Sequence, residues 1–153
     1  MPRTHVLRRA ACAAALACLV AVPAAADLAP WDQARATGIA KQLAAACDAF
    51  DQAVRKQPGM DRLGSGNAEE GFGLGQRAQA LREQSLALAD HLGKGKGHDE
   101  TKDEWRSLQE IADDVEQRGQ RSEFDDPTLA AWAKVADLMR QLAPYYDPKA
   151  LAP

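Results

Sequence analysis

The sequence has little cysteine, and therefore little means of cross-linking a small domain. Its 153 residues include three cysteines, and two of them, Cys12 and Cys18, lie in an apolar N-terminal segment. The third, Cys47, has no partner in the rest of the chain, which excludes a framework of internal disulfides there. Its helical phase places Cys47 on an apolar face, so we interpret it as a small buried group and not as a nucleophile.

Sequence motifs of several functional classes are also missing. No Cys-x-x-Cys-His occurs, which excludes covalent attachment of a c-type haem. Neither Glu-x-x-His nor His-Glu-x-x-His occurs, which excludes the usual di-iron bundle and zinc-protease helices. We find no set of residues suited to catalysis and predict that the protein is not an enzyme.

Aromatic residues make up only 5% of the chain, and β-branched residues are few outside the N-terminal segment. Both kinds of residue are the usual material of strands, so we expect an all-α protein.

The first 26 residues have the features of a secretory signal peptide. Three arginines precede an apolar run over residues 10–22, and Ala24-Ala25-Ala26 follows. The run has about 13 residues, fewer than the roughly 20 that span a bilayer. We predict cleavage after residue 26 and a periplasmic or secreted domain over residues 27–153. A retained membrane anchor and a lipid on Cys18 are the alternatives.

Cleavage would make the protein more acidic. The signal segment holds three of the 19 basic residues and none of the 22 acidic ones, so the net charge falls from −3 to −6. Such a domain is a poor candidate for binding nucleic acid or anionic lipid. We expect one domain with no membrane span after cleavage, whose partner is an unknown protein or a small-molecule ligand.

Four segments have apolar residues at helical spacing. The predicted helices run from about Pro30 to Gln57, Leu74 to Leu92, Thr101 to Gly119 and Asp126 to Ala143. We interpret Thr101-Lys102-Asp103-Glu104 as a capping box. Asp126, followed by Pro127, is the predicted cap of the last helix. The predicted inward stripe of that helix consists of Leu129, Trp132, Ala136, Met139 and Ala143.

The links between the predicted helices differ in length. Gly59–Gly73 contains five glycines and is predicted to be a long loop between the first two helices. The other two links are short, which favours antiparallel neighbours. Together these features predict a four-helix bundle with up-down-up-down topology.

Acidic residues crowd the end of the third predicted helix, at Asp113, Asp114 and Glu116. We interpret them as a solvated face. A divalent cation is the alternative, although the spacing of a calcium-binding loop is absent.

An up-down-up-down bundle would gather distant residues at one end. Its aromatic members are Trp31, Trp105, Tyr145 and Tyr146, which we interpret as a plug that closes the core. His91, His98 and Met139 are expected near the same end, and their side chains are suitable ligands for haem or a soft metal ion. We expect a non-catalytic binding module without a cofactor. The alternative is a bundle that binds haem b or copper through His91 and Met139, with His98 as a further donor.

Overall fold

The computed structural model describes residues 28–57, 68–119 and 124–147. They form four α-helices and one 3-10 turn: α1 (Gln33–Lys56), α2 (Ala68–Gly93), α3 (His98–Gly119), α4 (Asp126–Leu142) and η1 (Ala143–Tyr145). No strand occurs in these ranges, which confirms the all-helical prediction for the described part of the chain. The predicted signal segment and residues 59–67 of the predicted loop lie outside it.

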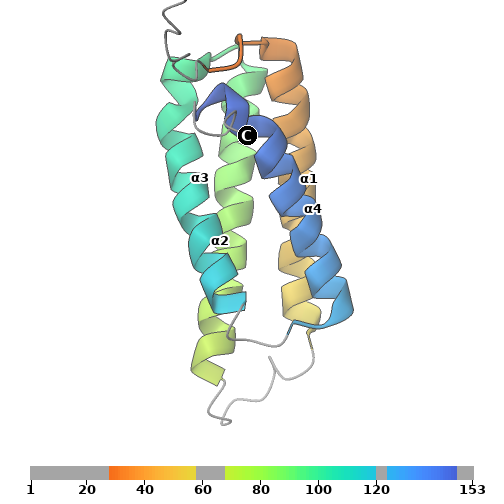
Figure 1. The fold of residues 1–153 in the computed structure, drawn as a ribbon. Helices are drawn as coiled ribbons and strands as arrows, with labels where there is room; N and C mark the ends of the chain where they lie inside the picture. The colour runs from red at the N-terminus through yellow and green to blue at the C-terminus, as the bar shows by residue number, and fades with distance from the viewer. Residues whose placement is uncertain (1–27, 58–67, 120–123, 148–153) are drawn as a thin grey trace, which may run out of the picture.

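The helices pack side by side around a shared core. In Figure 1, α1 lies against α2 and α4, and α3 lies against α2. All four helices contribute fully buried side chains to this core, among them Leu43, Phe50, Leu81, Leu88, Leu108, Val115, Val135 and Leu138. Within the described residues, no comparable packing joins α3 to α4. On one side of the described molecule, α3 and α4 therefore face each other without close packing.

Polar contacts hold together the end at which α1 begins. The Gln33 side-chain amide donates from Nε2 to the carbonyl oxygens of Leu92 (2.8 Å) and Lys96 (3.1 Å), which lie at and beyond the end of α2. The Ala29 backbone N–H donates to the Pro144 carbonyl oxygen over 2.9 Å. The start of α1, the end of α2 and the turn after α4 are therefore neighbours.

The start of α2 corrects the predicted loop, because the helix begins at Ala68 and not at Leu74. Gly73 has a packing role. A Cβ atom at this position would lie 2.8 Å from the guanidinium Nη1 of Arg118 in α3.

The predicted helix caps are also corrected. α3 begins at His98, and the Glu100 carboxylate accepts a hydrogen bond from the Gly97 N–H, so Thr101 does not cap the helix. Thr101 is buried instead, because its hydroxyl donates to the Gly97 carbonyl oxygen and contacts the hydroxyl of Tyr146. The cap of α4 is Asp125, whose carboxylate accepts from the Thr128 N–H.

The inward face of α4 lies one residue away from the predicted stripe. Thr128, Val135, Leu138 and Leu142 are buried, whereas Leu129 is 49% exposed. Leu86 of α2 is likewise apolar and 47% exposed. The other residues of the predicted α4 stripe are half-buried, and they form the wall of a groove described below.

None of the helices that the structure describes is both long enough and apolar enough to cross a membrane.

Candidate functional site

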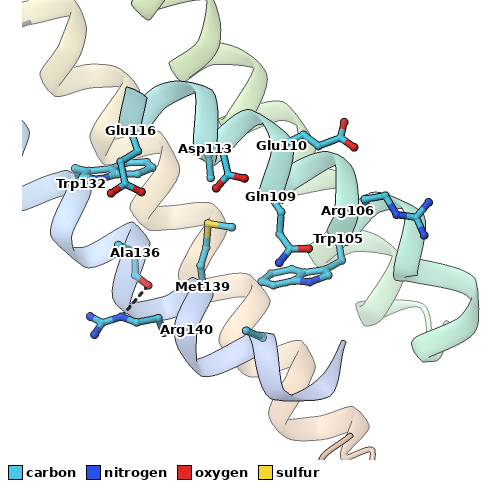
Figure 2. A pocket seen from close by; sticks show the side chains of 12 residues that line it. Trp105, Arg106, Gln109, Glu110, Asp113, Glu116, Trp132, Ala136, Met139 and Arg140 are labelled. Carbon is cyan, nitrogen blue, oxygen red and sulfur yellow. Dashed lines mark hydrogen bonds between the residues drawn. The ribbon is translucent and has the colours of Figure 1, made fainter. Parts of the chain in front are cut away.

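A groove of about 540 Å³ runs between α3 and α4, on the side where these helices do not pack together (Figure 2). Its apolar wall consists of Trp105, Ala112, Trp132, Ala136, Met139 and Ala143. The volume falls within the roughly 300–1,000 Å³ of typical small-molecule pockets, and aromatic walls are common in such pockets.

The spacing of residues on α4 explains how one helix serves both the core and the groove. Val135 and Leu138 face the core, and the next residue after each, Ala136 and Met139, lines the groove. Successive residues on a helix are about 100° apart, so two adjacent apolar stripes cover two faces. The width of the apolar surface on α4 thus exceeds what packing in the core requires.

The polar lining of the groove comes mainly from α3, beside apolar residues of both helices. Figure 2 shows the side chains of Gln109, Asp113 and Glu116 directed into the space between the helices, whereas Arg106 and Glu110 extend away from it. Within the described part of the chain, neither Asp113 nor Glu116 forms an ion pair. The groove is therefore bordered by two carboxylates without a cationic partner.

Both arginines near the groove already have acidic neighbours on their own helices. Arg106 lies 3.3 Å from an oxygen of Asp103, and Arg140 lies 3.4 Å from an oxygen of Asp137. Arg140 also donates from Nε to the carbonyl oxygen of Ala136, which holds it along α4 (Figure 2). These pairs leave the carboxylates of Asp113 and Glu116 as uncompensated charge beside the groove.

Trp105 forms part of the apolar wall and is only 3% exposed. Its ring stacks on Tyr146, with ring centroids 5.1 Å apart and an interplanar angle of 16°. The indole Nε1 is buried and has no hydrogen-bond partner among the described residues. An unpaired buried donor costs about 1–3 kcal/mol.

The structure brings together the aromatic residues that the sequence placed at one end. Trp31 makes edge-to-face contacts with His98, Tyr145 and Tyr146, at centroid distances of 5.7–5.9 Å. The His98 ring also stacks on that of Tyr146, with ring centroids 5.5 Å apart. Burial raises the pKa of the Tyr146 hydroxyl, which is also hydrogen-bonded to Thr101. This cluster closes the end of the core at which α1 begins.

The proposed metal or haem ligands lie in different surroundings. His91 is on α2, and its Nδ1 lies 2.8 Å from a carboxylate oxygen of Glu104 on α3. His98 has its Nδ1 2.9 Å from Asp99 and its ring among the aromatic residues. Met139 lines the groove. The two histidines each lie beside a different carboxylate, and haem or copper binding by these three residues stays a prediction.

The acidic residues at the end of α3 divide between two roles that sequence reasoning did not separate. Asp114 pairs with Arg77 of α2 and with Arg118 of its own helix, at 2.6 and 3.1 Å. Asp113 and Glu116 line the groove. Their spacing of three residues was a signal that they share one face, but the position of α4 opposite that face was not readable from the sequence.

Within the segments that the structure describes, no three His, Cys, Asp or Glu side chains are grouped to hold a metal ion. Comparison of the chain with models of protein families, with curated proteins and with solved structures gives no match.

Proposed function

We propose that this protein is a non-catalytic binding module of an up-down-up-down four-helix bundle, and that its ligand binds in the groove between α3 and α4. We further propose that the domain is exported after removal of its signal peptide. The observation that carries the binding proposal is the groove itself, an apolar hollow of about 540 Å³ with two indole rings on its walls.

The alternative use of an apolar helical face is core packing. On α4 a different face supplies the fully buried residues, and Trp132 and Met139 pack only in part against the core. Val135, Leu138 and Leu142 supply the buried side of α4. Trp132 and Met139 lie beside them and are left half-buried on the groove. Burial of apolar area contributes about 25 cal/mol per Å², so a ligand that covers these side chains gains affinity from surface that the fold leaves accessible.

The proposal is tested by titrating the mature protein with 4-phenyl-1-butanol, a neutral probe with an apolar ring, while tryptophan fluorescence is recorded. Trp105 and Trp132 line the groove, so binding should change the emission in a saturable manner. We expect a dissociation constant on the order of 1 mM or tighter for a ligand of this size.

Two alanines of α4 provide a matched pair of variants. Ala136→Phe should fill the groove and abolish the fluorescence change, because Ala136 lies on its wall. Ala133→Phe places the same ring on the exposed side of α4 and should bind as the unmodified protein does. Absence of saturable binding, or equal binding by both variants, would refute the groove as the ligand site.

A further inference from the structure

We infer that the groove between α3 and α4 selects organic cations with an apolar body, an inference that rests on the proposed binding function. The two carboxylates directed into the groove, those of Asp113 and Glu116, have no ion-pair partner in the described chain, and the groove offers no free cation. A ligand that fits such a wall carries an ammonium group at one position and an aromatic or aliphatic body beside it.

The placement of Trp132 adds a second attraction for a cation. Its indole lies at the same end of the groove as the Glu116 side chain (Figure 2). A cation over the face of a tryptophan gains about 0.5–1 kcal/mol at an exposed site. An ammonium group near Glu116 is therefore favoured by the carboxylate and by the ring, while the apolar body of the ligand covers Met139.

Exposure of the two carboxylates limits the size of the effect. Asp113 and Glu116 are both exposed, so salt screens their attraction for a ligand. Arg106 and Arg140 do not cancel this attraction, because each lies beside an aspartate of its own helix. The same two carboxylates repel an anionic ligand, so the binding of an anion is disfavoured.

The test uses three probes that share one hydrocarbon body and differ in charge: 4-phenylbutylamine, 4-phenyl-1-butanol and 4-phenylbutyrate. At neutral pH and low salt we expect the amine to bind about fivefold or more tighter than the alcohol, and the acid to bind weakest. Added salt should reduce the advantage of the amine and leave the affinity of the alcohol nearly unchanged.

Two sets of variants locate the selectivity. Asp113→Asn combined with Glu116→Gln should bring the amine and the alcohol to similar affinity without loss of alcohol binding. Glu83→Gln removes one charge from an exposed residue of α2 that does not line the groove, and it should keep the preference.

The possible outcomes separate the two proposals. Equal binding of the amine and the alcohol by the unmodified protein would overturn cation selectivity and leave the binding function standing. A preference that survives in the double variant would also overturn the assignment to these carboxylates. Failure of all three probes to bind would refute the binding function itself. A concentration-dependent dimer that loses binding as it forms would identify the groove as an interface between two copies.

Discussion

At the scale of single residues, the reactivity of Cys47 is determined by its surroundings in the core. The residue is 0% exposed, and it contacts Ser85 of α2, which is also fully buried. Burial raises the pKa of the thiol from 9.0 to about 11, and the hydrogen bond with Ser85 opposes this only in part. The thiolate, which is the reactive form, is therefore strongly disfavoured in the folded protein.

We expect Cys47 to resist alkylation by iodoacetamide at pH 8 and to react rapidly once the protein is unfolded in guanidinium. Because the folded pKa is raised, this thiol contributes stability below pH 9, and that contribution is lost as the pH rises toward 11. The free energy of unfolding should fall less steeply over this range in Cys47→Ala than in the unmodified protein. Rapid labelling of the folded protein at pH 8 would contradict the assignment.

Two glycines differ in the room they leave for a Cβ atom, and they give opposite predictions for an alanine substitution. A Cβ atom on Gly38 would meet nothing within 4 Å, so Gly38→Ala should raise the free energy of unfolding by up to about 1 kcal/mol. A Cβ atom on Gly119 would lie 2.6 Å from Cζ of Phe124, whose ring packs against Phe50. Gly119→Ala should therefore lower that free energy, by about 1–3 kcal/mol. Urea unfolding followed by circular dichroism measures both, and a stabilised Gly119→Ala would show that the Phe124 ring moves aside freely.

At the scale of elements, side chains of α1 donate hydrogen bonds to a backbone carbonyl group at the end of α2. The Leu92 carbonyl oxygen accepts from Gln33 and also from the Thr37 hydroxyl, at 2.8 and 3.2 Å. The last carbonyl groups of a helix lack partners within it, so these contacts cap α2 and tie it to α1. Gly95 then turns the chain toward α3 with a φ of 84°, which glycine adopts without strain.

Removal of the Gln33 amide should loosen this end. Gln33→Ala should lower the free energy of unfolding by about 1–2 kcal/mol, since Leu92 keeps its bond from Thr37 while Lys96 loses its partner. Gln52→Ala is the matched control, because Gln52 is exposed and bonds only along its own helix to Asp48. Equal effects of the two substitutions in chemical denaturation would argue against the cap.

Helical periodicity predicted the existence and type of all four helices, but not their ends or their exact inward faces. α3 begins at His98, three residues before the predicted start, and the hydroxyl of the predicted cap, Thr101, instead contacts that of Tyr146, 45 residues away in sequence. The inward face of α4 was misassigned because Leu129 is apolar yet exposed, and Thr128 is polar yet buried. Such choices depend on the position of neighbouring helices, which periodicity within one helix does not report.

At the scale of the whole molecule, the described helices make three packed sides and one open side. The aromatic end was predicted from the sequence, on the expectation that the helices alternate in direction. In the structure, the rings of Trp31 and Trp105 both contact that of Tyr146. The groove was not predictable. Its apolar residues looked like core and its carboxylates looked like solvated surface, because the sequence does not state that α3 and α4 remain apart.

The predicted processing of the chain belongs to the same scale. Expression with the full sequence should yield exported material whose mass corresponds to a chain that begins at Asp27, because Ala24-Ala25-Ala26 ends a short apolar run. Intact-mass spectrometry of the periplasmic or secreted fraction measures this. A retained N-terminal segment, or a mass increase from lipid on Cys18, would disprove cleavage at that position.

The hydrogen bond between Ala29 and Pro144 has a consequence for the order in which the domain assembles. A chain that emerges N-terminus first, from a ribosome or through a membrane channel, presents Ala29 long before Pro144 and the aromatic residues after it. The ring contacts of Trp31 with Tyr145 and Tyr146 cannot form until nearly all of the described residues have emerged. The closing contacts span almost the entire described sequence, and contacts of such long separation form late because loop closure costs entropy. Emergence of Tyr145 and Tyr146, and not the formation of α1, thus sets the moment at which this end of the domain can close.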